Sequence, residues 1–215
     1  MKYSLSYQEP VELNDGKIVT FRAIQPSDKS ALSDAFEQLS LESRRRRFLA
    51  SKSGLTDKEL NYFTEIDGVN HYAIVAVVTT AEDGAQSGAG VARIVRTDDD
   101  PAAAELAIVI ADAWQRRGIG RKLLERIVAV ASERGIKRIR AMSLADNDQL
   151  RGLLEKYDDG VEVGPTRSGV LQFTLTVPPP DRHAAMDAMI SILRLAALVE
   201  GTDVQLEKKE EDRSC

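Results

Sequence analysis

Residues able to hold a phosphate group are concentrated in the short segment 115–120, which reads QRRGIG and precedes Arg121 and Lys122. Glycines let the backbone approach a ligand closely and present its N–H groups. A helix that begins here adds the positive end of its dipole. Together these features predict an anion site suited to a pyrophosphate. The same residues are also compatible with a tight strand-to-helix turn that has solvated arginines and binds no ligand.

Two common phosphate-binding motifs do not fit this segment. The P-loop pattern Gly-x-x-x-x-Gly-Lys-Ser/Thr does not occur. The dinucleotide pattern Gly-x-Gly-x-x-Gly would need a third glycine where Leu123 stands. A nucleotide-binding protein is therefore disfavoured.

The elements around the segment must position it. An apolar strand is predicted at 104–110 and a second at 138–144. Between them, one apolar stripe at helical spacing predicts a long helix that Gly135 ends. The stripe consists of Ile119, Leu123, Leu124, Ile127, Val128 and Ala131. A strand, a helix and a strand in this order favour a parallel crossover.

The remaining pattern predicts a mixed α/β (α+β) sheet with helices on its faces. Strands are predicted at 17–24, 72–79, 91–96 and 170–177, and helices from Pro26, from the capping box at Thr56, over 148–157 and from Asp181 to about Val199. Residues 81–90 are small and polar and predict a hairpin loop. The charged tail 200–215 is typical of disorder.

The amino-acid composition limits the classes of partner and the cellular compartment that we expect. The 215 residues carry a net charge of −5, which disfavours a nucleic-acid partner. The single cysteine, Cys215, excludes an intramolecular disulfide and favours a reducing compartment. We expect a cytoplasmic protein without a membrane partner, because residues 1–6 lack a signal-peptide pattern and the apolar run 184–199 is short and charged. We expect no metal, since His71, His183 and Cys215 are scattered.

The QRRGIG segment resembles the Gln/Arg-x-x-Gly-x-Gly/Ala signature of the GNAT superfamily of N-acetyltransferases. The similarity extends over about 11–177, which predicts a GNAT-like acyl-CoA N-acyltransferase fold. Three stretches, 15–28, 39–48 and 104–110, resemble the bacterial Pat-type protein lysine acetyltransferases. We therefore expect an acetyltransferase domain at 1–177, a C-terminal helical extension at 178–199 and a disordered tail at 200–215. The companion domain that often accompanies the Pat type is not evident in this sequence.

The resemblance implies that two parallel strands splay and hold acetyl-CoA between them. The backbone of the first strand would pair with the pantetheine arm, and the glycine segment would hold the pyrophosphate. Asn147 matches the family's asparagine that contacts the pantetheine arm, and it is equally suited to be a helix N-cap. The implied cofactor-binding residues are Ile108, Val109, Ile110, Gln115, Arg116, Arg117, Gly118, Ile119, Gly120, Arg121 and Asn147.

Acetyl transfer to an amine requires a neutral nucleophile, whereas a lysine amine, with a pKa of about 10.4, arrives protonated. A carboxylate can accept that proton, directly or through water. Glu105 is the acid on the predicted cofactor strand, and it matches the general base of Pat-type enzymes. Its residue type and position alone also fit an outward-facing strand glutamate.

Two departures from the family leave the general acid unassigned. Many GNAT enzymes place a tyrosine where Leu154 stands, with Tyr157 three residues further on. The family's Gly-Phe after that helix is replaced by Asp158-Asp159-Gly160-Val161. These departures keep a catalytically silent acyl-CoA-binding module open beside the enzyme, whose acceptor would be a protein lysine or, as the alternative, a small amine.

Weaker patterns have two interpretations each. The basic run 44–47 fits a solvated helix face or a contact with the 3′-phosphate of CoA or an acidic partner. His71 fits a structural histidine better than a catalytic one. An apolar stripe in the last helix is typical of a docking or homodimer surface; it comprises Met186, Met189, Ile190, Leu193 and Ala197.

Overall fold

The computed structural model describes residues 1–79, 86–157 and 161–180. Residues 1–179 form one compact unit. The predicted helix at 181–199 and the predicted tail lie outside the described residues, as do residues 81–85 of the predicted hairpin loop. The domain boundaries beyond residue 180 therefore stay predictions.

The described residues form a mixed eight-stranded sheet, in the order β1-β2-β3-β4-β5-β6-β8-β7. All neighbouring strands are antiparallel except β5 and β6, which are parallel, as the crossover pattern predicts. The strands are β1 Gln8–Glu12, β2 Ile18–Ala23, β3 His71–Thr79, β4 Gln86–Arg96, β5 Ala103–Ile110, β6 Arg138–Leu144, β7 Glu162–Val163 and β8 Val170–Thr176.

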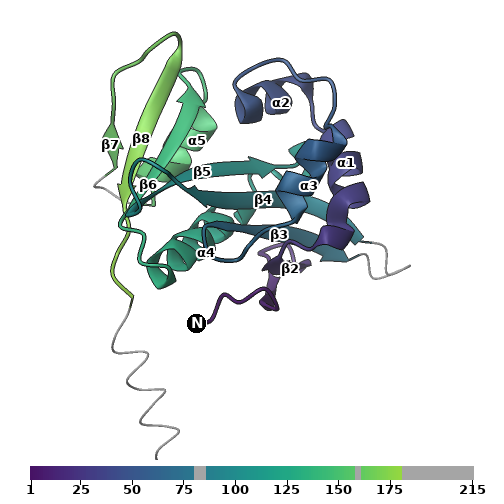
Figure 1. Cartoon of the computed structure of the whole chain (residues 1–215). Coiled ribbons are helices and arrows are strands. Elements are labelled where there is room, and N and C mark those ends of the chain that lie inside the picture. Colours follow the sequence, from purple (N-terminus) through teal and green to yellow (C-terminus); the bar gives the residue numbers. More distant parts are fainter. Residues whose placement is uncertain (80–85, 158–160, 181–215) are drawn as a thin grey trace, which may run out of the picture. The chain divides into compact units, whose positions relative to one another are not determined.

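Three helices follow one another between β2 and β3, a long one lies between β5 and β6 and a short one follows β6; together they cover both faces of the sheet (Figure 1). They are α1 Lys29–Glu37, α2 Leu41–Phe48, α3 Asp57–Thr64, α4 Ile119–Glu133 and α5 Asp148–Glu155, with short 3-10 turns at Pro26–Asp28 and Asp112–Trp114. The capping box at Thr56 is confirmed, because its hydroxyl accepts from the N–H of Glu59 and the Glu59 carboxylate accepts from the N–H of Thr56. No helix in the described ranges is long and apolar enough to cross a membrane.

The parallel pair separates along its length. Pairing between β5 and β6 runs only from Ala103 and Arg138 to Leu106 and Ala141. β5 continues to Ile110 on the side of β4, and β6 continues to Leu144 on the side of β8. The two strands therefore form a fork that opens toward their carboxyl ends, as the resemblance implies.

Helix α4 covers one face of the sheet because its apolar stripe matches the alternation of the strands. Leu123, Leu124 and Ile127 are fully buried and pack with strand residues such as Ile74 and Ile94. Successive side chains of a strand point to opposite faces. Arg93 and Val75 therefore point to the other face, where α1 and α3 lie. Gly135 has φ +69°, a left-handed conformation that suits glycine at a helix end.

Four parts of the fold differ from the sequence prediction. Strands β1 and β7 and helix α2 were not predicted. Strand β1 is polar and contains Pro10, β7 has only two residues, and half of the residues of α2 are arginine. Residues Gln86–Gly90 belong to β4 rather than to a loop. Small residues fit there because strand packing is close: a Cβ at Gly90 would lie 2.7 Å from Ile110 Cδ1 and 2.9 Å from the Val109 carbonyl oxygen. A polar, glycine-rich segment can therefore be part of a strand where the adjacent strand leaves no room for larger side chains.

Candidate acyl-CoA site

A cleft of about 490 Å³ lies at the open end of the fork. It contains nine of the eleven predicted cofactor-binding residues, and α2 and α5 add the rest of its lining. The nine are Ile108, Val109, Ile110, Gln115, Arg116, Gly118, Gly120, Arg121 and Asn147. Residues more than 30 positions apart in the sequence thus meet in one cavity of the size that small-molecule ligands occupy.

The turn before α4 has an unusual backbone. Arg116 has φ +62° and Gly118, the N-cap of α4, has φ +81°. The first N–H groups of a helix have no acceptor within it, and among the described residues no side chain caps α4. These N–H groups, the helix dipole and the cleft-lining Arg116 and Arg121 make this end of the cleft favourable for an anion.

Two of the predicted residues do not line the cleft. Arg117 donates to Asp15 Oδ2 at 2.8 Å and its guanidinium lies 5.0 Å from the centre of the Trp114 ring. Ile119 is 1% exposed and packs in the core beneath α4. The Arg117 side chain therefore fixes the turn to the β1–β2 loop, and Ile119 anchors the start of α4.

Asn147 is a helix N-cap and also a cleft residue. Its Oδ1 accepts the Leu150 N–H at 3.2 Å, so it is the N-cap of α5. It is largely buried and also lines the cleft. The N-cap prediction is confirmed, and the contact with the cofactor stays a prediction.

Glu105 lies where β5 and β6 are still hydrogen-bonded to each other, and it is not among the residues that line the cleft. Its side chain is exposed on β5, with Arg140 of β6 as its parallel neighbour. Arg140 donates to Asp99 at 3.0 Å, and Asp99, Asp100 and Glu105 together raise the pKa of this guanidinium. Ile108, the first cleft residue on β5, is three positions on, or roughly 10 Å along a strand.

Helix α2 forms the cleft wall opposite α5. The sequence predicted no helix with this role, although a contact of its basic run with CoA was one of the two interpretations. Ser43, Arg46 and Arg47 line the cleft. The solvated-face interpretation of the basic run is wrong for two members. Arg44 donates to the carbonyls of Leu39, Glu37 and Ser53, and Arg47 is stacked on aromatic rings.

Asp112 fastens α2 to the turn before α4. Its carboxylate accepts the Ser40 N–H at 2.8 Å, the Ser40 hydroxyl at 3.1 Å and the Ser43 hydroxyl at 2.6 Å. Gln115 Nε2 donates to the same carboxylate at 3.2 Å and to the Ile110 carbonyl at 3.2 Å. One carboxylate thus joins the end of β5, the glycine turn and the start of α2.

Asp112→Ala should weaken acetyl-CoA binding about tenfold, because hydrogen bonds to a charged group that align two cleft walls are lost together. Asp34→Ala on the exposed side of α1 is the matched control. Titration calorimetry with acetyl-CoA measures both variants. Equal affinities would show that the Asp112 hydrogen bonds do not organise the site.

His71 is a structural histidine, as predicted. Its Nε2 is hydrogen-bonded to Arg93 Nη1, and its ring lies against Tyr62. Burial, together with the charge of Arg93, lowers the pKa of His71 to about 4. The folded protein therefore holds this imidazole neutral, as an acceptor for Arg93.

His71→Gln should reduce the loss of stability on acidification. Between the unfolded pKa of about 6.5 and the folded pKa of about 4, the unfolded chain binds a proton that the folded one does not, so stability falls as pH falls through this window. A glutamine keeps an acceptor but does not titrate. Melting temperatures of both proteins from about pH 7 to about pH 4.5 test this, and identical pH slopes would contradict it.

The position matched to the family's tyrosine is filled by a core residue. Leu154 is fully buried. Tyr157 packs against the core and is not among the described residues lining the cleft. Leu154 has no proton to donate, and the general acid stays unassigned.

The forked parallel strands, with a glycine turn and a helix start at their open end, have the architecture of an acyltransferase domain that binds acyl-CoA. A model of the acetyltransferase (GNAT) family matches residues 34–158, more than half of the chain. The chain belongs to this family, and the resemblance found in the sequence is confirmed.

Bacterial acetyltransferases are similar to this chain in sequence and in structure. Acetyltransferase Pat from Mycolicibacterium smegmatis is 29% identical over 172 residues, covering 80% of this chain and 50% of that protein. An acetyltransferase from Pseudomonas aeruginosa is 28% identical over 141 residues, covering 66% of this chain and 74% of that protein. The crystal structure of the GNAT domain of S. lividans PAT superposes with a TM-score of 0.69 at 29% identity, covering 79% of this chain and 96% of that one. The chain spans half the length of the M. smegmatis relative.

Proposed function

We propose that this protein transfers the acetyl group of acetyl-CoA to a primary amine, and that the acceptor is a protein lysine. The observation that carries the proposal is the meeting of the fork, the glycine turn and the N-terminus of α4 in one cleft. The family match supports the donor, and the similarity to Pat proteins supports the lysine acceptor.

Different residues of the cleft bind different parts of the donor. The N–H groups before α4, with Arg116 and Arg121, bind the pyrophosphate, and Asn147 binds the pantetheine arm. The backbone of β5 at residues 108–110 pairs with the same arm, because β6 is hydrogen-bonded to β5 only as far as Leu106. A free strand edge offers N–H and C=O groups to an extended ligand.

Transfer proceeds by direct attack in a ternary complex. The amine attacks the thioester carbon, a C–N bond forms, the C–S bond breaks, and CoA leaves as a thiolate. Glu105 accepts the proton of the lysine ammonium, acting through water because its side chain lies outside the cleft. The second proton, which the nitrogen loses as it becomes an amide, goes to the thiolate. The thiolate needs little help to leave, since a thiol has a pKa of about 8.5.

Mass spectrometry can test this function. The protein is incubated with isotope-labelled acetyl-CoA and a bacterial lysate, and peptides are searched for labelled acetyl-lysine. Enzyme-dependent label on protein lysines supports the proposal. Label only on small amines would move the acceptor to the alternative class.

A catalytically silent acyl-CoA-binding module is the second candidate. It is favoured by Leu154 at the position of the family's tyrosine and by the place of Glu105 outside the cleft. Tight acetyl-CoA binding, with no labelled product from lysate proteins or from a panel of small amines, is the result that selects it.

A further inference from the structure

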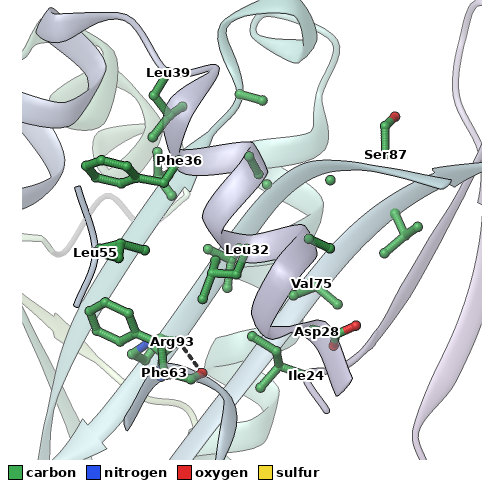
Figure 2. Close-up of a pocket in the computed structure, with 18 of the residues that line it drawn as sticks. Ile24, Asp28, Leu32, Phe36, Leu39, Leu55, Phe63, Val75, Ser87 and Arg93 are labelled. Atoms are coloured by element: carbon green, nitrogen blue, oxygen red, sulfur yellow. Dashed lines mark hydrogen bonds between the residues drawn. The ribbon is translucent and has the colours of Figure 1, made fainter. Parts of the chain in front are cut away.

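A second cavity, of about 150 Å³, lies between α1, α3 and the sheet face opposite α4. Figure 2 shows α1 crossing it, with Leu32, Phe36 and Leu39 on the helix side and Val75 on the strand side. Its lining is chiefly aliphatic and aromatic. A cavity of about this volume can hold a benzene molecule.

Three arginines line this largely apolar cavity, and one of them, Arg22, is paired with Asp28. The other two are Arg47 and Arg93. Arg93 is 5% exposed, lies 4.8 Å from the centre of the Phe63 ring and donates to the Phe63 carbonyl at 2.8 Å (Figure 2). Arg47 is stacked on the rings of Phe48, at 4.9 Å, and Phe63, at 5.9 Å. Burial lowers the pKa of Arg47 to about 10 and that of Arg93 to about 9, the latter also through the charge of Arg47. Both are cationic at neutral pH.

No carboxylate compensates these two charges within the described ranges 1–79, 86–157 and 161–180. The ion pairs found there include neither arginine. The acid among the described cavity residues, Asp28, is bound bidentately by Arg22 at 2.7 Å on both oxygens. Arg93 is buried and Arg47 is partly buried, and the hydrogen bonds of Arg93 go to neutral groups, the His71 ring and the Phe63 carbonyl. Cations withdrawn from water without a carboxylate are costly, and this pair is therefore suited to an anionic ligand.

The cavity adjoins the acyl-CoA cleft. Val109 and Arg47 line both. Val109 belongs to the stretch of β5 proposed to pair with the pantetheine arm, so the cavity lies beside the path of the donor.

We propose that this cavity binds the acyl chain of a CoA thioester whose chain ends in a carboxylate, of the succinyl class, with Arg47 and Arg93 as partners of that carboxylate. The proposal rests on the proposed function, because it needs the cleft to hold CoA. An apolar stem fits the aliphatic lining, and a carboxylate matches two guanidinium groups. The ammonium of a lysine acceptor is repelled by the same two cations, which assigns the cavity to the donor.

The test compares three donors by titration calorimetry: acetyl-CoA, butyryl-CoA and succinyl-CoA. Butyryl and succinyl chains have four carbons each and differ in the terminal carboxylate. The wild type should bind succinyl-CoA about tenfold more tightly than butyryl-CoA, as one charge-assisted contact provides. Arg47→Met keeps an apolar stem and should abolish this preference. Arg45→Met, on the exposed side of the same helix, should preserve it.

Three results would overturn the proposal. Equal or weaker binding of succinyl-CoA than butyryl-CoA in the wild type rejects the cavity as a carboxylate site for the donor. A preference that survives Arg47→Met rejects the assigned partner. If succinyl-CoA has no advantage but amines bearing a carboxylate are acetylated in an Arg47-dependent way, the carboxylate belongs to the acceptor. Failure of all three thioesters to bind, acetyl-CoA included, instead rejects the proposed function together with this inference.

Discussion

Glu105→Gln should lower turnover by ~10²–10⁴, the usual contribution of general base catalysis. The affinity for acetyl-CoA should stay near that of the wild type, because the amide is almost isosteric and Glu105 lies outside the cleft. Glu12→Gln, at an exposed position of β1, is the matched control and should keep full activity. Steady-state rates with a lysine peptide measure the difference.

The pH dependence distinguishes a base from a residue that only positions the substrate. As pH rises toward the lysine pKa of about 10.4, more acceptor amine is already neutral and the loss in Glu105→Gln should shrink. The ratio of wild-type to variant kcat/KM from about pH 7 to about pH 10 follows this. A ratio near one throughout would leave Glu105 an ordinary strand glutamate, and a large constant ratio would make it a positioning residue.

Gly120→Glu should reduce acetyl-CoA affinity by at least two tenfold steps, on the order of 3 kcal/mol. A Cβ at this position would meet Ile110 Cγ1 and Leu153 Cδ2 at 3.6 Å, which is ordinary contact, so the fold should survive. The added carboxylate would stand in the cleft where the pyrophosphate is proposed to bind and would repel it.

Gly54→Glu is the control for Gly120→Glu, because a Cβ at Gly54 meets nothing within 4 Å and the residue lies in an exposed loop. Calorimetry with acetyl-CoA and a melting curve of each variant separate lost binding from lost folding. A folded Gly120→Glu protein with wild-type affinity would remove the glycine turn from the proposed site.

The central elements follow from the sequence because their signals are local and strong. The stripe from Ile119 to Ala131 and the Gly135 stop define α4, and the β-rich run Arg138–Leu144 is strand β6 as predicted. A strand-helix-strand order then favours a parallel crossover. The fork itself followed from the family resemblance rather than from any pattern in β5 or β6.

The parts that escaped prediction depend on contacts between distant residues. Helix α2 has almost no apolar stripe, and it is held by Ser40 and Ser43 binding Asp112, about 70 residues later in the chain. Arg116 and Arg117 are adjacent arginines, yet Arg116 lines the cleft whereas Arg117 pairs with Asp15. Which arginine lines a cleft is decided by partners that spacing does not reveal.

The most direct test of the account is hydrogen–deuterium exchange of the wild-type protein with and without acetyl-CoA. If acetyl-CoA lies in the fork, its pyrophosphate and pantetheine arm will engage backbone N–H groups of residues 108–110 and 115–121, and exchange there will slow. We predict protection of these two segments, and its disappearance in Gly120→Glu. Protection confined to other parts of the chain, or no change at saturating acetyl-CoA, would contradict the assignment of this cleft.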